Sequence, residues 1–283
     1  MSTTRLTAAM TLAIALSAPG RAQAETYHTC AGFIDSLPAV IRTQGTWCLR
    51  RDLSTRMVTG EAITIAANNV TIDCNGFKIG GLPAGTGTGA TAILAEFRLN
   101  AAVRHCAIRG FSQGIAFIGT GGGHLVEDNR FEANRAIAIN VNGDGSAIRR
   151  NSVSDSGGGT SQSKAVGINA LGAVDIRDNV VQGMAPDAMW TNATVTGIVA
   201  MWNDHGAIAG NRVGGLVSAG RGVARGIDAY YSGTVTIRDN ILVGDGRAGG
   251  TGIECGAAGV ALDNVVHRFA TPVNGCTESG TLP

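Results

Sequence analysis

A short phrase that recurs along the chain constrains the fold more than any other feature of this sequence. Two full copies read Ile-Arg-Asp-Asn-Val-Val at residues 176–181 and Ile-Arg-Asp-Asn-Ile-Leu at residues 237–242. With Cys106 counted as a replacement for Asn, the fourth position of the phrase falls at Asn75, Cys106, Asn129, Asn151, Asn179, Asn211, Asn240 and Asn264. The spacings between these positions range from 22 to 32 residues. This pattern predicts stacked repeats that carry loops of variable length, inserted at residues 155–165, 183–196 and 214–225.

A second phrase follows each copy of the first and indicates that every repeat contains at least two short strands. Its copies share Gly followed by Ile, and they begin at Gly114, Gly167, Gly197, Gly226 and Gly252. The flanking residues alternate between β-branched and polar side chains, which is typical of strands with one buried face. Glycine makes up 42 of the 283 residues, which disfavours helices throughout, whereas the 44% of hydrophobic residues suffices for a core.

A solenoid of stacked coils explains why Asn recurs at one position. Equivalent residues of neighbouring coils lie about 4.8 Å apart, so an inward-facing Asn can bond its own backbone and the Asn above and below. We therefore predict an asparagine ladder, with Cys106 tolerated because Cys is small and readily buried. Leucine-rich repeats need Leu at fixed positions and propeller blades need about 40 residues, so both fit this spacing less well.

The repeated phrase resembles that of the right-handed parallel β-helix superfamily, the pectate-lyase-like solenoids, over about residues 58–276. The resemblance implies an all-β fold, a right-handed parallel β-helix solenoid of about eight coils. Residues 44–53 resemble the N-terminal cap of exported bacterial β-helix proteins. We therefore expect a cap at residues 25–57 and a β-helix domain at residues 58–283 that includes a C-terminal cap, because an open solenoid end exposes apolar side chains and strand edges.

The first 24 residues have the pattern of an export signal. Arg5 precedes the apolar run 6–18, and Ala22-Gln23-Ala24 is a small-x-small cleavage site. The run is too short to span a bilayer, so we predict a secreted or periplasmic protein without a membrane anchor. The whole chain carries a net charge of +1, which argues against a nucleic-acid partner bound through bulk basicity.

Six cysteines in an exported chain favour disulfides, although six allow 15 pairings. We expect Cys30–Cys48 and Cys255–Cys276, which join neighbouring segments. Cys74 and Cys106 could also pair, but they occupy different positions in the repeat. A zinc site is disfavoured because no C-x-x-C motif occurs and the five His are scattered.

Chemistry-bearing side chains concentrate toward the C-terminal coils. The position after the second-phrase Ile points outward, which places Asp228, Tyr230 and Glu254 on one face. Carboxylates one coil apart stand about 5 Å from each other, a separation that suits a retaining hydrolase or a shared cation. We select as candidate catalytic residues Asp204, His205, Asp228, Tyr230 and Glu254. Candidate substrate-binding residues, chosen for sugar stacking or for contact with acidic groups, are Trp190, Trp202, Tyr231, Arg225 and Lys164.

The resemblance implies that an outer face binds an extended polysaccharide and carries out β-elimination, epimerisation or hydrolysis of acidic sugars. We predict an exported polysaccharide lyase of uronate-containing glycans. The alternatives are a non-catalytic glycan-binding or structural surface β-helix, or a glycoside hydrolase. The outward residues Arg149, Arg177 and Arg238 could bind uronates, but pairing with neighbouring acids is the stronger expectation.

The sequence names no resident metal and no definite cofactor, and it leaves calcium open. Residues 140–145, Asn-Val-Asn-Gly-Asp-Gly, resemble the start of a calcium loop, but position twelve is Asn151 rather than Glu. The Gly-rich stretches lack phosphate-binding fingerprints, and neither G-x-S-x-G nor H-E-x-x-H occurs.

Overall fold

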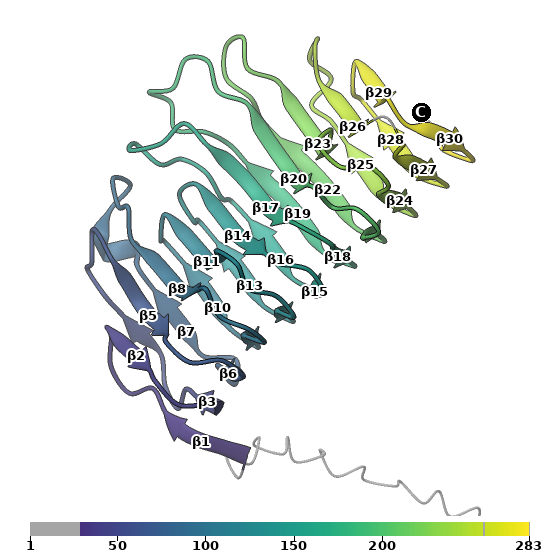
Figure 1. Cartoon of the computed structure of the whole chain (residues 1–283). Coiled ribbons are helices and arrows are strands. Elements are labelled where there is room, and N and C mark those ends of the chain that lie inside the picture. The colour runs from purple at the N-terminus through teal and green to yellow at the C-terminus, as the bar shows by residue number, and fades with distance from the viewer. Residues whose placement is uncertain (1–28, 257, 283) are drawn as a thin grey trace, which may run out of the picture.

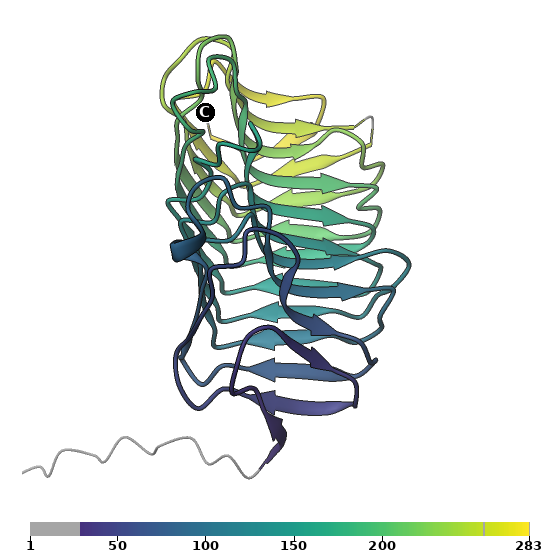
Figure 2. The ribbon, with the colours of Figure 1, turned by 90° about the vertical axis from the view of Figure 1, so that its left-hand side faces the viewer.

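The computed structural model describes residues 29–256 and 258–282, in which three parallel sheets wrap around one elongated core (Figures 1 and 2). The predicted export signal lies outside the described residues. Sheet A contains β1 (Cys30–Phe33), β3 (Gly45–Cys48), β6 (Val70–Asp73), β9 (Ala102–Arg104), β12 (Leu125–Glu127), β15 (Ser146–Arg149), β18 (Val174–Arg177), β21 (Ala207–Ala209), β24 (Thr236–Arg238), β27 (Val260–Leu262) and β30 (Thr277–Ser279).

The other two sheets have the same parallel arrangement. Sheet B contains β2 (Ala39–Ile41), β5 (Glu61–Ile65), β8 (Thr91–Glu96), β11 (Gln113–Ile118), β14 (Ile137–Asn142), β17 (Ala165–Leu171), β20 (Val195–Met201), β23 (Ala224–Ala229), β26 (Thr251–Cys255) and β29 (Thr271–Asn274). Sheet C contains β4 (Leu53–Ser54), β7 (Lys78–Gly80), β10 (Ala107–Arg109), β13 (Arg130–Glu132), β16 (Ser152–Ser154), β19 (Val180–Met184), β22 (Arg212–Leu216), β25 (Ile241–Val243) and β28 (Val265–His267).

The chain visits the sheets in the order A, C, B, and each visit to all three completes one coil. From β3 to β29 this gives nine consecutive coils in the described part of the chain. The structure confirms the predicted all-β parallel β-helix. The count exceeds the expected eight by one because β3, β4 and β5 already form a complete coil, and β3 and β4 lie in the segment predicted as the cap. A 3-10 turn at Leu82–Ala84 interrupts the link from β7 to β8.

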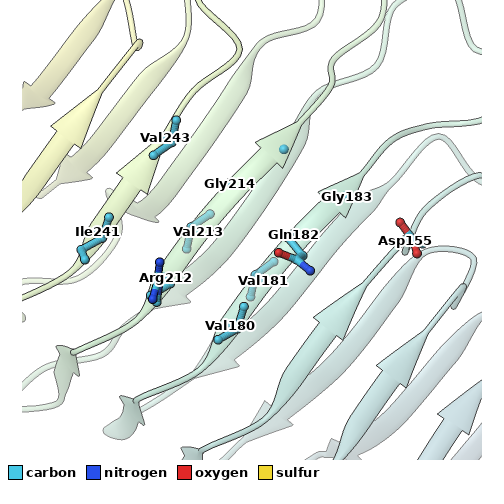
Figure 3. Close-up of a pocket in the computed structure, with 11 residues that line it drawn as sticks. Asp155, Val180, Val181, Gln182, Gly183, Arg212, Val213, Gly214, Ile241 and Val243 are labelled. Carbon is cyan, nitrogen blue, oxygen red and sulfur yellow. The ribbon is translucent and has the colours of Figure 1, made fainter.

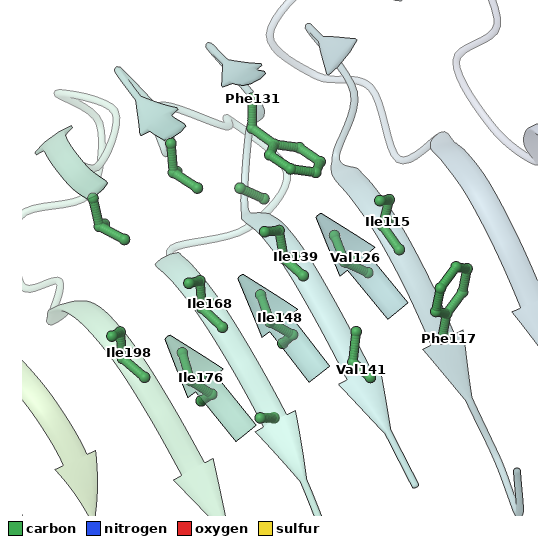
Figure 4. Close-up of a cluster of buried hydrophobic side chains, with 14 of the residues drawn as sticks. Ile115, Phe117, Val126, Phe131, Ile139, Val141, Ile148, Ile168, Ile176 and Ile198 are labelled. Carbon is green, nitrogen blue, oxygen red and sulfur yellow. The ribbon is translucent and has the colours of Figure 1, made fainter. Parts of the chain in front are cut away.

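Ile and Val from sheets A and B meet inside the coils and form the core. Figure 4 shows Ile139 and Ile168 of sheet B facing Ile148 of sheet A, and each of these side chains is fully buried. Burial of one such side chain contributes roughly 2 kcal/mol. The recurring Ile and Val of the two phrases thus place an apolar pair inside each of these coils.

The Gly of the second phrase lies where a side chain would collide with the next coil. A Cβ on Gly167 would lie 2.5 Å from Cγ1 of Val181 and 2.6 Å from the carbonyl oxygen of Gly197. Gly197 and Gly226 are equally crowded. The Gly of this phrase is therefore needed because sheet B lies close to sheet C and to the next coil. It is not needed for an unusual backbone angle.

The predicted asparagine ladder is present at the turn between sheets A and C. The Asn179 backbone N–H and its Nδ2 each donate to Oδ1 of Asn211 at 3.0 Å, and Nδ2 also donates to the carbonyl of Ile148 at 2.9 Å. The same pattern links Asn129, Asn151, Asn179, Asn211, Asn240 and Asn264. All six side chains are buried, so the ladder satisfies backbone groups that water cannot reach.

The ladder ends at Cys106, and the prediction that Asn75 belongs to it is wrong. Four residues separate β6 from β7, whereas two separate β9 from β10. The longer turn places Cys74 next to Cys106, and the two form a disulfide. The Asn75 amide instead donates to the carbonyl of Leu49 at 3.2 Å. Sequence alignment of the phrase could not reveal this shift because it matched Asn75 to a turn of different length.

The structure also contains the two other expected disulfides, Cys30–Cys48 and Cys255–Cys276, so no cysteine is free among the described residues. Three disulfides fit a protein that resides in an oxidising compartment. The described residues include no helix whose length and hydrophobicity would allow it to span a membrane.

His124 belongs to a second buried polar column, at the turn between sheets B and A. Its Nδ1 accepts the backbone N–H of Ala101 at 3.2 Å, and its own N–H donates to Oγ of Ser146 at 3.0 Å. Its ring lies 4.9 Å from that of Phe117. Burial lowers the pKa of His124 below its usual value, because the charged imidazolium would lose its hydration.

We predict that Asn179→Ala destabilises the fold far more than Asn75→Gly. The first change removes the acceptor of the buried Asn151 N–H and Nδ2 and one donor to the Ile148 carbonyl, at a cost of about 3 kcal/mol. Asn75→Gly removes one partly buried hydrogen bond, from the Asn75 amide to the Leu49 carbonyl, at a cost below about 1 kcal/mol. Glycine tolerates the backbone angle at this position, φ 49°. Urea unfolding of both variants measures the difference, and equal losses would contradict the assignment of the ladder.

We predict that acidification destabilises the protein partly through His124. Because the folded-state pKa is depressed, the unfolded chain binds a proton first, and stability falls as pH drops below about 6.5 toward the folded-state pKa. In His124→Asn, Oδ1 can still accept the Ala101 N–H but the side chain no longer titrates. The melting temperature of this variant should decrease less between about pH 7 and about pH 5 than that of the wild type. Parallel pH profiles would refute this role for His124.

Candidate functional site

Three of the predicted site residues form an ion cluster on the outer face of sheet B. Arg225 and Asp228 belong to β23, and Glu254 lies beside Asp228 on β26. Nη1 of Arg225 lies 2.7 Å from Oδ2 of Asp228, and Nε of Arg225 lies 3.7 Å from Oε2 of Glu254. Because Gly226 and Ile227 are both buried, residues 225 and 228 both face outward and can pair.

The ion cluster is only partly accessible to solvent. The carboxylate side chains of Asp228 and Glu254 are 17% and 16% exposed, whereas Arg225 is 38% exposed. Oδ1 of Asp228 also accepts the backbone N–H of Tyr230 at 3.3 Å. The cluster therefore consists of two carboxylates and one guanidinium, and its formal net charge is −1. It lies next to the turn that carries Tyr230.

Trp202, Tyr230 and Tyr231 form an aromatic ridge at the end of sheet B. Trp202 and Tyr231 occupy equivalent positions in neighbouring coils, and the backbone N–H of Trp202 donates to the carbonyl of Tyr231 at 3.2 Å. Their exposed fractions are 63% and 64%, and Tyr230 is 54% exposed. The rings of Tyr230 and Tyr231 meet edge to face with centroids 5.1 Å apart. The ridge presents a large apolar area to solvent beside the ion cluster.

Asp204 and His205 share the turn of Trp202, but their contacts are structural. Oδ1 of Asp204 accepts the backbone N–H groups of Gly233 at 2.6 Å and Thr234 at 3.1 Å, which ties this turn to the next coil. Nδ1 of His205 lies 3.5 Å from Oγ1 of Thr234. Within the described residues no carboxylate forms an ion pair with His205. The turn therefore offers no oriented acid–base pair.

Trp190 and Lys164 lie at the opposite ends of the strands of sheet B from the ridge. Both belong to loops that lead from sheet C into sheet B, and Nε1 of Trp190 donates to the carbonyl of Gly159 at 2.8 Å. This bond fastens the loop 183–196 to the loop 155–165. Trp190 precedes β20 and Trp202 follows it, so the strand separates them by roughly 20 Å. The structure thus does not bring all ten predicted residues into one cleft.

Arg135 is a residue that the sequence analysis did not select. It lies two residues before Ile137, as Lys164 lies two residues before Val166, and Ile137 and Val166 are paired in sheet B. Its Nε is buried without a hydrogen-bond partner. Burial lowers the pKa of Arg135, and the charge of Asp187 opposes that shift. Nothing in the local sequence distinguishes Arg135 from an ordinary surface cation, because its burial depends on the loops of the following coils.

The outer face of sheet A carries paired charges, as expected. Arg149 pairs with Glu127 at 2.9 Å, and Arg238 pairs with Asp239. Arg177 pairs at 3.0 Å with Asp175 of the same strand. Sheet A therefore has few cations to offer to an acidic ligand.

The described residues contain no group of three or more His, Cys, Asp or Glu side chains that could hold a metal ion. The segment that resembles a calcium loop is engaged otherwise. The Asn140 amide donates to Gln113 at 3.1 Å and accepts from Asn169 at 2.8 Å, and Oδ1 of Asp144 accepts the Ala173 N–H at 2.8 Å. Because these side chains already form hydrogen bonds with protein groups, they do not fit a calcium site.

A groove on the outer face of sheet C is the feature that the sequence analysis missed. It consists of three adjoining hollows with volumes of about 250, 700 and 530 Å³, which share Arg130 and Val180 where they meet. Figure 3 shows the C-terminal hollow, with Arg212 between Val180 and Ile241. Small outward residues such as Ala107, Ser152 and Gly214 leave the space. The small outward residues can be found in the sequence, but they form a row only after the strands of sheet C are aligned with one another.

A coiled rod with an internal amide ladder and side chains in outward rows defines the class of parallel β-helix proteins. Residues 91–275 match the family described as the right-handed β-helix region, and this stretch is well over half of the chain. The protein therefore belongs to the right-handed β-helix family.

Among solved structures, the chain is similar to the crystal structure of the Dettilon tailspike protein (gp208), with 13% sequence identity and a TM-score of 0.34. The match covers 86% of this chain and 60% of the tailspike chain, so this chain spans less than two thirds of the tailspike chain. No curated protein matches the sequence.

Proposed function

We propose that this chain is an exported protein that binds an acidic, uronate-containing polysaccharide along sheet B. The observation that carries the proposal is the aromatic ridge beside the ion cluster. Trp202 and Tyr231 are exposed by 63% and 64% and occupy equivalent backbone positions in consecutive coils. Exposed aromatic rings suit the apolar faces of sugar rings, while their polar edges remain in water.

The ion cluster complements the aromatic ridge chemically. Sugar hydroxyls donate hydrogen bonds to carboxylates such as Asp228 and Glu254, and a guanidinium such as Arg225 binds a uronate carboxylate through two parallel bonds. Arg225 already contacts both acids, so a uronate would exchange for one of them. This exchange keeps the charge of the guanidinium compensated throughout binding.

Cations near the entrances of the strands support the choice of an acidic glycan. Arg135 and Lys164 precede neighbouring strands of sheet B, and neither forms an ion pair within the described residues. The Nε of Arg135 is buried without a partner, and this desolvation costs free energy that an anionic ligand would recover. A neutral glycan would leave that cost uncompensated.

Export is part of the proposal. Residues 1–24 have the pattern of a cleaved signal, and three disulfides stabilise the described part of the chain. A secreted or periplasmic location would bring the sheet B face into contact with extracellular polysaccharides.

A lyase activity is the second candidate, and the position of Tyr230 favours it. Its backbone N–H donates to Asp228, so Tyr230 directly follows the strand that carries Arg225 and Asp228. In β-elimination a base removes the proton from C5 of the uronate, the bond from C4 to the leaving oxygen breaks, and an acid protonates that oxygen. Arg225 would stabilise the charge on the uronate carboxylate, and Tyr230 would transfer the proton. Hydrolysis is less well supported because Arg225 engages both carboxylates of the only adjacent acid pair on this face in the described residues.

We predict that Trp202→Ala combined with Tyr231→Ala weakens binding to alginate or polygalacturonate by tenfold or more, at about 1 kcal/mol for each stacking contact. Titration calorimetry on residues 25–283 measures the affinity. Phe97→Ala is the matched control, since Phe97 is an aromatic residue with 59% exposure in the equivalent turn of β8. An equal loss in the control, or no binding by the wild type, would refute the proposal.

We predict that Tyr230→Phe abolishes any release of unsaturated uronates while it leaves the affinity within about twofold. The ultraviolet absorbance of the product measures turnover, and calorimetry measures binding in parallel. Tyr231→Phe is the control, because it removes the neighbouring phenol and keeps the ring. Wild-type protein that binds but never generates the absorbance would exclude the lyase and retain the binding function.

A further inference from the structure

The groove on the outer face of sheet C, hereafter the sheet C groove, is not used by the proposed function. It runs across strands β7, β10, β13, β16, β19, β22 and β25, along the axis of the solenoid. Its floor is the outward face of these strands, and its two rims are the turns that enter and leave sheet C. A continuous channel of this kind accommodates an extended chain rather than a compact small molecule.

The charges in the groove divide into paired and unpaired cations. Lys78 pairs with Asp52 at 3.0 Å, Arg109 with Glu132 at 3.2 Å, and Arg150 on the rim with Asp128 at 2.7 Å. Arg130 and Arg212 are both exposed, and neither guanidinium forms an ion pair or a hydrogen bond with any residue that the structure describes. Two cations are therefore available to an anionic ligand.

The two unpaired arginines occupy the same outward row. Arg130 pairs in register with Ser152, Ser152 with Val180, and Val180 with Arg212. Three coil spacings separate the guanidinium-bearing positions, which is about 14 Å along the axis. A ligand that contacts both arginines must carry at least two anionic groups and extend over this distance.

The groups between and beside the arginines are suited to hydroxyls. Ser152 and Gln182 face the groove, and the carboxylates of Asp155 and Asp178 stand at its rims. Acidic side chains repel a uniformly anionic polymer, but they accept hydrogen bonds from hydroxyl groups. The strands use their backbone groups to pair with one another, so a peptide could not bind there by adding a strand. The pattern thus fits a polymer that alternates carboxylates with many hydroxyls.

We propose that the sheet C groove is a second binding site for an acidic polysaccharide, anchored by Arg130 and Arg212. This inference rests on the proposed function for the class of ligand, but it concerns a different face and different residues. An acid-bearing sugar would place one carboxylate on each guanidinium and its hydroxyls on Ser152, Gln182 and the rim acids. Two such faces on one rod would let the protein hold two segments of a glycan network.

The test compares Arg130→Ser combined with Arg212→Ser against Arg42→Ser combined with Arg56→Ser. The control pair is likewise exposed, forms no side-chain ion pair with the described residues and removes the same charge. Titration calorimetry uses uronate oligosaccharides too short to reach both faces. The wild type should bind at two sites, and the groove variant should lose one of them, with an affinity change of tenfold or more at that site. The salt dependence of that site should reflect about two neutralised charges.

The outcomes separate the two proposals. If the groove variant keeps both sites, or if the control loses one as well, the groove inference is overturned while binding at the ridge stands. If the ridge variant with Trp202→Ala and Tyr231→Ala loses one site and the groove variant loses the other, both proposals hold. If polyglutamate binds the groove as tightly as the oligosaccharide, the assignment to a glycan is overturned. If the wild type binds no uronate oligosaccharide, the proposed function fails and the inference fails with it.

Discussion

The amide ladder between sheets A and C is the interaction on which the rest of the structure depends. Within the ladder, Nδ2 of an Asn donates both to the amide oxygen of the next coil and to a backbone carbonyl of the preceding coil, as Asn179 does with Asn211 and Ile148. From the coil of Cys106 to the coil of Asn264, these bonds fix the rotation of each coil relative to its neighbours. Because the coils cannot rotate independently, each outward side chain lies directly above its equivalent. The rows on sheets B and C, and therefore every candidate binding surface, are consequences of this register.

The same register explains which parts of the fold could be predicted from the sequence. Asn residues spaced by 22 to 32 positions determine a coil and its loops without knowledge of any loop conformation. The prediction failed at Asn75 because the phrase was matched by residue identity, whereas the turn from β6 to β7 is two residues longer than the next turn. The Cys74–Cys106 disulfide replaces the missing amide contact at that point. Turn length is decided by three-dimensional pairing, which the phrase alone does not encode.

The candidate site divides along a similar line. The outward positions of Asp228 and Glu254 were predictable, since they follow the buried Ile of the second phrase. The engagement of Asp204 with the backbone of Gly233 and Thr234 was not, because it joins residues 29 and 30 positions apart across a turn. The burial of Arg135 depends on loops of later coils, and the sheet C groove depends on side chains that are small. A sequence pattern shows which side chains are present. It shows less readily where small side chains leave a groove, or which charged side chain loses its contact with water.

The distribution of charge over the three outer faces provides the strongest indication of how such a rod would meet an acidic polymer. On sheet A the outward arginines, Arg149 and Arg177 among them, are neutralised by acids on the same or neighbouring strands. Sheet C retains unpaired cations at Arg130 and Arg212, and the strand entrances of sheet B retain Arg135. Because the ladder satisfies the interior independently of the surface, nothing in the folding of the coils requires these cations to be unpaired. Their position away from sheet A leaves these cations available to an anionic ligand, which is why the proposed ligand is an acidic glycan.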